Sequence, residues 1–486
     1  MGCGYGLLLI AHDSQIHGIE HDLYGVVQAI REIENASVPI NRLPPEILSN
    51  VLEHRTGEQD LVAATHVCRH WRSVLISSPS LWNCFRLHSS YDLDRTLTYL
   101  ERSKSAPIDI SISADSPRDL DVLDHLAPQI ARTRSLIIRV SHDIHAVFLL
   151  LCNSAPSLQH LEIRAFDSVK PLPENFLGRQ TPSLRSVRFS CVRPEFESFP
   201  PLPNLTEFHL FLPESAGPFH MGALFRFFSD CPVLQKVGIN IRGQIVQGIA
   251  QGRVISLESL VELEYVCHFN DLILPFLRLP RLKKLWVTSL GPGQVHNLAD
   301  TLPHDGHTLL AGVTKILYYF DIFARLLRVK LSGNGVDVSL GEFCATDATT
   351  VDWLSDQTLI PLGQIEDLKV EGSPFTTGFP ISFFALENLR VLRVALWDSQ
   401  FTEELLRLLH PAPGTGVPCP SLREIEYTCY GPRLTPLTSL IKERKRSGQQ
   451  LRLLCILAGH ELDQDLVEEL RDDVGEVRVR GWDERV

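Results

Sequence analysis

Two pairs of closely spaced histidines are the residues of this chain that could hold a metal ion. His304 and His307 are three residues apart, as are His142 and His145 on either side of Asp143. A zinc site needs further Cys, His or carboxylate ligands at short spacing, and neither pair has them. We therefore predict solvated loop histidines at 304 and 307, a helix-capping role for Asp143, and no metal site.

Other catalytic signatures are missing from the sequence. It contains neither a Walker-type phosphate loop nor a Gly-x-Ser-x-Gly nucleophile elbow. Its eleven cysteines are scattered without a Cys-x-x-Cys pair, which favours reduced thiols in an intracellular compartment. Cys152, Cys231 and Cys267 fall beside apolar positions and are expected to behave as small apolar residues. We predict no cofactor and no enzyme; the alternative is a hydrolase with its site within residues 291–358.

Composition and charge narrow the range of partners. The 486 residues are 44% hydrophobic and 21% charged, and the formal net charge is −12. This balance is typical of a folded protein and makes nucleic acid a poor partner. No apolar run approaches the length of a membrane span, so no membrane partner is predicted. We expect a cytoplasmic or nuclear protein. The basic run 442–446 could act as a nuclear localisation signal, but a solvated helix end is the preferred interpretation.

Residues 38–88 have the pattern of a small bundle of helices. Pro44 and Pro45 suit a first helical turn, where a missing N–H costs nothing, and Glu46 favours the positive helix end. Apolar residues then recur at helical spacing, and two further apolar runs follow from Leu61 and from Cys68. A bundle of about fifty residues is marginal in isolation. Its surplus apolar face is therefore expected to meet another surface, either a partner or the rest of this chain.

The bundle resembles an F-box, the segment through which substrate receptors dock on the Skp-type adaptor of cullin–RING ubiquitin ligases. The resemblance rests, in order, on Leu43-Pro44, Glu46-Ile47-Leu48, Asp60-Leu61, Val67-Cys68, Trp71-Arg72 and Leu81-Trp82. It implies that the adaptor is bound by Leu43, Pro44, Glu46, Ile47, Leu48, Val51, Leu52, Leu61 and Trp71. One departure is Arg55-Thr56-Gly57, where the family usually has an apolar residue closing the first helix, so the local helix end is in question.

The segment before the bundle, residues 1–37, is predicted to be helical. Its apolar residues step by 3, 4, 3, 4 and 3 positions, as in a short coiled coil: Ile16, Ile19, Leu23, Val26, Ile30 and Ile33. About two and a half heptads do not guarantee a stable dimer. We expect this stripe to pack back onto the chain, with homodimerisation as the alternative.

The remainder, residues 89–486, is predicted to be a solenoid of repeats. A motif of the form Leu-x-x-Leu-x-apolar recurs about ten times, often with Pro two positions ahead, as in 182–189 and 420–427. Its early copies are spaced by roughly 21 to 29 residues, within the range of leucine-rich repeats. No such unit buries its apolar face alone, so neighbours complete each other's core. The alternative is an α/β domain with one parallel sheet.

This region resembles the irregular leucine-rich repeats of F-box receptors. The Asn or Cys that usually follows the strand is mostly absent, so uneven curvature is expected. A non-repeating insert is predicted at about 291–358, with Gly333-Asn334-Gly335 as the turn of a hairpin. Residues of about 460–486 are predicted to form a terminal cap. The predicted fold class is thus α/β, a helical F-box bundle followed by an irregular solenoid with one larger insert.

The predicted function follows from these two parts. By resemblance, the F-box docks on a Skp-type adaptor of a cullin–RING, SCF-type ligase, and the solenoid presents a bound protein for ubiquitination. The alternative is a repeat scaffold that never enters a ligase. Residues between the buried strand positions should project from the sheet and bind the unknown substrate. The candidates are His160, Glu162, Arg164, Arg188, His209, Lys284, Trp286 and Arg393.

Overall fold

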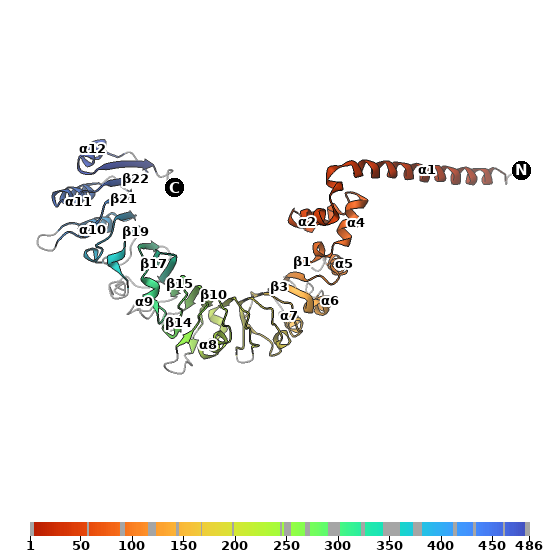
Figure 1. Cartoon of the computed structure of the whole chain (residues 1–486), viewed down its shortest axis with the longest axis horizontal. Helices are drawn as coiled ribbons and strands as arrows, with labels where there is room; N and C mark the ends of the chain where they lie inside the picture. The colour runs from red at the N-terminus through yellow and green to blue at the C-terminus, as the bar shows by residue number, and fades with distance from the viewer. Residues whose placement is uncertain are drawn as a thin grey trace. The chain divides into compact units, whose positions relative to one another are not determined.

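A computed structural model describes the chain in segments (Figure 1). The described residues are 4–55, 58–87, 93–114, 123–141, 145–166, 168–196, 199–243, 245–246, 254–267, 273–289, 302–321, 326–343, 360–372, 382–411, 416–430, 434–459 and 462–481. The chain divides into two compact units, Met1–His160 and Leu161–Val486, and each is described by itself.

The first unit begins with helices. They are α1 (Gly4–Ser37), η1 (Pro39–Arg42), α2 (Pro45–Arg55), α3 (Glu58–Ala64), α4 (Arg69–Ser77) and η2 (Pro79–Trp82). Leu48, Leu75 and Trp82 are fully buried between them, and the Trp82 indole donates a hydrogen bond to the carbonyl of Leu75 at 2.7 Å. The sulfur of Cys68 accepts a hydrogen bond from the Trp71 N–H at 3.5 Å, capping α4. The predicted bundle is therefore present, with its own apolar core.

Helices and strands then alternate, as the sequence predicts. The elements are β1 (Cys84–Leu87), α5 (Leu93–Ser103), β2 (Ile108–Ala114), α6 (Leu123–Leu126), η5 (Ala127–Arg132), β3 (Thr133–Val140) and α7 (His145–Leu150). β1, β2 and β3 pair in parallel. The first compact unit thus extends well beyond the F-box bundle and includes the first strands of the solenoid.

The stripe on α1 does not pack onto the first unit, contrary to the prediction. Ile19 and Ile33 are 68% and 73% exposed, and Leu23, Val26 and Ile30 are also exposed. The polar side of the helix faces the bundle instead, because Gln28 and Glu32 accept hydrogen bonds from the Arg69 guanidinium at 2.5 and 2.6 Å.

The second unit is built on short parallel strands with mainly alternating burial. The strands that carry the repeat motif are β4 (His160–Ala165), β6 (Ser186–Ser190), β8 (Glu207–Leu212), β10 (Lys236–Ile241), β13 (Glu262–Cys267), β15 (Lys284–Ser289), β19 (Asp367–Gly372), β20 (Val391–Leu396), β21 (Glu424–Cys429) and β22 (Leu453–Ala458). Parallel pairs link β6, β8, β10, β13 and β15 in succession, and then β19 to β22 and the last strand, β23 (Glu476–Gly481). This pairing confirms the α/β solenoid fold.

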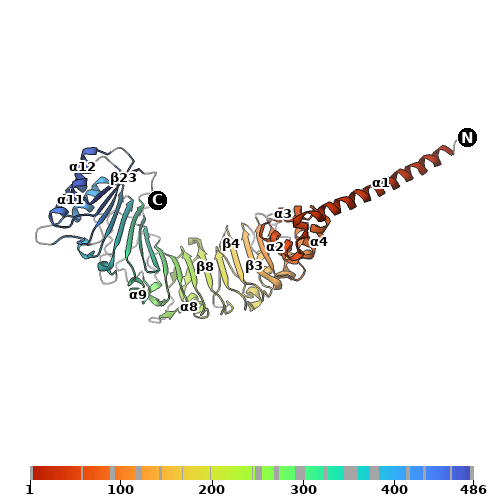
Figure 2. The same cartoon turned by 45° about the horizontal axis from the view of Figure 1, so that its top comes forward.

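The crossovers between the strands carry helices and very short strands. The α-helices are α8 (Met221–Ser229), α9 (Gly306–Leu310), α10 (Ser399–Leu408), α11 (Thr435–Arg446) and α12 (Gln464–Asp473); the 3₁₀ helices are η6 (Phe176–Arg179), η7 (Glu214–Ala216), η9 (Leu274–Phe276), η12 (Leu362–Gln364) and η13 (Phe383–Ala385). Two-residue pairs join β5 (Lys170–Pro171) to β7 (Val192–Arg193), β9 (Phe219–His220) to β11 (Ile245–Val246), and β12 (Ile255–Ser256) to β14 (Leu277–Arg278). Figure 2 shows the helices on one side of the strands, which leaves the other side of the sheet uncovered by these crossovers.

The insert region adds three strands to the same sheet. They are β16 (Lys315–Asp321), β17 (Leu326–Gly333) and β18 (Val336–Phe343), and β17 pairs in the antiparallel sense with both β16 and β18. β18 pairs in parallel with β15, and β16 pairs in parallel with β19, so the insert enters the sheet in reverse order. Gly333-Asn334-Gly335 forms the predicted hairpin turn, with φ of 154°, 47° and 79°.

The basic run at the end of α11 is only partly the solvated helix end that its sequence suggests: Lys445 and Arg446 are exposed, but Arg444 is not. Arg444 is fully buried and donates hydrogen bonds to the carbonyls of Pro418 and Cys419, each at 2.9 Å. Lys442 forms an ion pair with Glu469 of α12. Burial lowers the pKa of Arg444 below its ordinary value. The run thus joins α11 to a neighbouring crossover and to α12.

Candidate functional site

Helix α2 separates its apolar residues into a buried and an exposed set. Leu48 and Leu52 are buried, as is Leu61 of α3, whereas Ile47 and Val51 are 46% and 40% exposed. The structure thus places Leu48, Leu52 and Leu61 in the core of the bundle. Contact of these three residues with an adaptor stays a prediction.

The remaining predicted adaptor-binding residues lie at the surface. Pro44 and Glu46 are exposed at the start of α2, and Leu43 and Trp71 are half-buried. The indole N–H of Trp71 donates a hydrogen bond to the Asn41 side chain at 2.5 Å, which ties α4 to the segment before α2. The exposed Pro44 and Glu46 and the exposed apolar residues Ile47 and Val51 are thus all at the surface of the bundle.

The predicted substrate-binding residues project from the sheet as expected. His160, Arg164, Arg188 and Lys284 are exposed, and Glu162, His209, Trp286 and Arg393 are half-buried. None belongs to the core, because strand residues alternate between the two faces of a sheet. Substrate binding by these residues stays a prediction.

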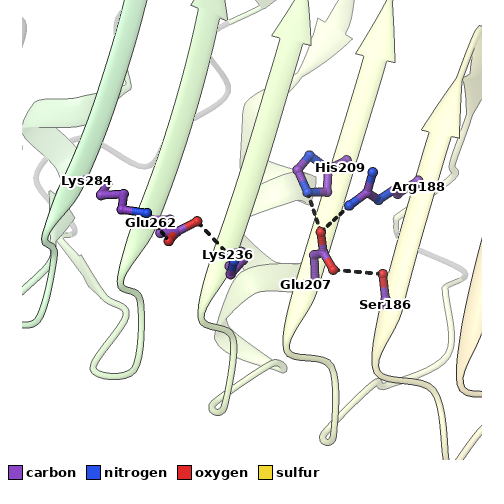
Figure 3. A network of polar contacts seen from close by, with 7 residues as sticks. All are labelled: Ser186, Arg188, Glu207, His209, Lys236, Glu262 and Lys284. Atoms are coloured by element: carbon purple, nitrogen blue, oxygen red, sulfur yellow. Dashed lines mark hydrogen bonds and ion pairs between the residues drawn. The ribbon is translucent and has the colours of Figure 1, made fainter. Parts of the chain in front are cut away.

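Glu207 is the centre of a polar network on this strand face (Figure 3). It accepts hydrogen bonds from Ser186 at 3.2 Å and Arg188 at 2.5 Å, and its carboxylate lies 2.9 Å from the His209 Nε2 atom. The imidazole lies over Gly238 of the next strand, where an added Cβ would come within 2.3 Å of Nδ1. Partial burial raises the pKa of Glu207, but Arg188 and His209 outweigh it and the pKa lies below its ordinary value.

A second carboxylate joins the next strands of the same face. Glu262 lies 2.9 Å from the Lys284 Nζ atom and 3.2 Å from that of Lys236 (Figure 3). The hydrogen bond from Lys284 lowers the pKa of Glu262, and Lys236 adds to the effect. The Lys284 ammonium also lies 5.9 Å from the centroid of the Trp286 ring. These contacts hold long charged side chains in place across β10, β13 and β15.

Two shallow grooves lie among these polar side chains. The first, of about 260 Å³, is lined by Arg164, Arg188, Phe189, Ser190, His209, Leu210, Phe211, Gly238, Ile239, Asn240 and Glu264. The second, of about 210 Å³, lies farther along the sheet beside Arg393, whose guanidinium forms an ion pair with Asp367 and lies 3.5 Å from Glu426. Grooves of this size accommodate a few side chains of a partner protein better than a large cofactor.

The acid stability of the second unit should depend on Glu207. Its pKa in the folded chain is below the ordinary value of 4.5, so the ionised carboxylate stabilises the fold above that pH. This contribution is lost as pH falls through the lowered pKa. Glu207→Gln should therefore have a shallower fall in Tm than the wild type between about pH 5 and 3. Differential scanning fluorimetry with Glu174→Gln, an exposed position, as control would measure this; parallel curves for wild type and Glu207→Gln would contradict it.

Sequence reasoning overlooked Glu262 and Gly238. Glu262 occupies the same position in its repeat as Glu207, two residues after Leu260 as Glu207 is after Leu205. Aligning the repeats would have found it. Gly238 carries no such signal, because its role depends on the imidazole of an adjacent strand.

The other chemical candidates gain no support. His304 and His307 are exposed, and the described residues contain no group of three or more potential metal ligands. Cys231 is buried, and burial raises its pKa to about 12, which suits an inert thiol. His142 and Asp143, the side chain of Cys267 and much of 291–358 lie outside the described residues.

Among the described residues, no helix combines the length and apolarity needed to cross a membrane.

Comparison with known proteins agrees with this architecture. Residues 40–88 match the family model described as F-box-like. A relative from Arabidopsis thaliana, named as F-box/LRR-repeat protein 9, is 23% identical over 231 residues, which are 42% of this chain and 91% of the relative. F-box domains in general bind Skp-type adaptors of ubiquitin ligases, and proteins of this architecture are in general adaptors rather than enzymes. The matched segment and the strand repeats together support an F-box protein with leucine-rich-type repeats.

Proposed function

We propose that the chain is a substrate receptor: its F-box docks on a Skp-type adaptor of a cullin–RING ligase, and its strand face holds a protein for ubiquitination. The F-box-like match at residues 40–88 carries the proposal. The exposed Ile47 and Val51 support it, because such side chains are suited to burial against a partner. The chain itself performs no chemistry in this scheme; associated subunits transfer ubiquitin.

The strand face supports the second half of the proposal. Its charged side chains are held by Glu207 and Glu262 rather than moving freely, so less conformational entropy is lost when a partner binds. Trp286 lies half-buried within this charged surface, and tryptophan is the residue type most often found at the energetic centre of an interface. We therefore place the substrate across β8 to β15.

Trp286→Ala should lower substrate affinity by about 30-fold, since an interface tryptophan typically contributes about 2 kcal/mol or more. Proteins bound to the tagged wild type and to the variant would be quantified by mass spectrometry, with proteasomal degradation blocked. Trp397→Ala, which removes an exposed indole elsewhere in the second unit, is the control. The adaptor should remain bound to both variants.

A ubiquitination reaction reconstituted with the Skp-type adaptor, cullin and RING subunits would then distinguish a substrate receptor from a repeat scaffold that acts outside a ligase. Proteins lost from Trp286→Ala should be modified by the wild-type complex. If they bind but are never modified while the adaptor is present, the chain is a repeat scaffold outside a ligase. If Trp286→Ala lowers Tm and leaves binding unchanged, the tryptophan has a structural role and the substrate binds elsewhere.

A further inference from the structure

The helix α1 presents an apolar stripe that its own unit leaves uncovered. Ile19, Leu23, Val26, Ile30 and Ile33 follow one another by four and three positions, and each is at least half exposed. This spacing places them on one side of the helix, as at the a and d positions of a coiled coil. A continuous apolar stripe exposed to water is a typical docking surface for another helix.

The orientation of α1 keeps this stripe available. Arg69 at the start of α4 donates to Gln28 and Glu32, which belong to the polar side of the helix. The contact therefore holds α1 to the bundle by the side opposite the stripe. The side chains of α1 are described from His17 onward.

The charges beside the stripe select the partner. With Leu23 and Ile30 at a positions, the flanking e and g positions hold Glu20, Asp22 and Glu34, together with Val27, Ala29 and Ala36. No flanking position between 17 and 37 has a lysine or arginine. Flanking charges of a coiled coil decide which helices pair. The rim of this docking surface is therefore acidic.

An acidic rim gives no electrostatic support to two other occupants. In a parallel pair of α1 helices, Asp22 of one helix lies beside Val27 of the other, and Ala29 beside Glu34, so no charge attraction results. In an antiparallel pair, the e positions of the two helices face each other, which brings Glu20 toward acidic residues of the second helix. An anionic membrane surface would likewise repel these carboxylates. We propose that α1 binds an amphipathic helix of another protein whose apolar stripe is flanked by Lys or Arg. This inference is independent of the proposed function, because α1 lies before the F-box-like segment.

Two synthetic helices would test the proposal with the full-length chain. Each has about four heptads with Ile and Leu at a and d; one has Lys at every e and g position, the other Glu. Self-repulsion keeps both probes monomeric. Fluorescence anisotropy should give at least about tenfold tighter binding of the Lys probe, from three attractive contacts instead of three repulsive ones. The preference should shrink between about 0.05 and 0.5 M salt.

Variants of the chain make the result specific. Leu23→Asp with Ile30→Asp should abolish binding of the Lys probe, whereas Leu97→Asp, an exposed leucine on α5, should leave it unchanged. Glu20→Lys, Asp22→Lys and Glu34→Lys together should reverse the preference toward the Glu probe. Gly25→Ala should tighten binding severalfold, since nothing lies within 4 Å of the added Cβ and alanine stabilises a helix by about 1 kcal/mol over glycine.

Three results would overturn the proposal. One is equal affinity for the two probes, or binding of neither. Another is a stable dimer of the chain by light scattering that Leu23→Asp with Ile30→Asp dissociates. The third is binding to anionic phospholipid vesicles that competes with the Lys probe. Adaptor capture by each α1 variant, measured in parallel, separates a failure here from a failure of the F-box assignment.

Discussion

Replacing Ile47 and Val51 by aspartate is expected to abolish capture of a Skp-type adaptor. Both side chains are exposed on α2, so the bundle loses little core packing when they change. An apolar anchor buried at an interface contributes about 2 kcal/mol or more, and a carboxylate buried without a partner costs more than the lost contact. The double variant should bind at least about 100-fold more weakly in a pull-down or by calorimetry.

Two control variants define what this result means. Leu97→Asp introduces the same charge at an exposed leucine on α5, outside residues 40–88, and should capture the adaptor normally. Leu48→Ala truncates a fully buried side chain and should lower the stability of the bundle by about 2–5 kcal/mol. Any effect of Leu48→Ala on adaptor capture would therefore result from unfolding of the bundle rather than from the loss of a contact with the adaptor. Normal capture by a folded Ile47→Asp, Val51→Asp chain would refute the placement of the adaptor on this face.

Gly372→Ala is expected to have the largest effect on the second unit. Gly372 ends β19 with φ of 102°, and an added Cβ would lie 2.0 Å from the carbonyl oxygen of Phe320 in the paired strand β16. Either the β16–β19 pairing or the backbone must move. We expect a loss of about 4 kcal/mol or more and a fall in Tm of roughly 10 °C. Calorimetry of the full chain would measure it.

Gly363→Ala is the matched control, because nothing lies within 4 Å of its added Cβ. Hydrogen exchange should accelerate from β16 to β20 in Gly372→Ala and stay normal in the F-box bundle, since repeats are stabilised mainly by their neighbours. Adaptor capture should persist in both variants. An unchanged Tm for Gly372→Ala would show that β16 and β19 are not paired in this register.

The repeats could be predicted because each strand carries its own copy of a short sequence motif. The motif Leu-x-x-Leu-x-apolar marks β6, β8 and β15 without any information from elsewhere in the chain. The exposure of Arg188 and Lys284 follows from the same alternation. Interactions between residues that are far apart along the chain could not be predicted from the sequence. The burial of Arg444 requires the carbonyls of Pro418 and Cys419, which lie more than twenty residues away.

The F-box helix shows a further limit of periodicity. Ile47 and Leu48 are adjacent and both apolar, so a helical stripe includes both, yet one is 46% exposed and the other fully buried. The stripe indicates the apolar side of a helix but not how much of it the rest of the bundle covers. The same reason explains α1, whose stripe was expected to be buried. Its orientation depends on Arg69, which lies 37 residues from Glu32.

The reversed order of β16, β17 and β18 has a consequence for the chain as it is synthesised. β15 ends at Ser289, but its partner in the sheet, β18, begins only at Val336. At about 5–20 residues per second, the ribosome needs several seconds to make the intervening segment. During that time the edge of β15 has open hydrogen-bonding groups, which is a condition that favours aggregation. We expect nascent chains stalled between these strands to be bound by chaperones more strongly than chains stalled after Phe343.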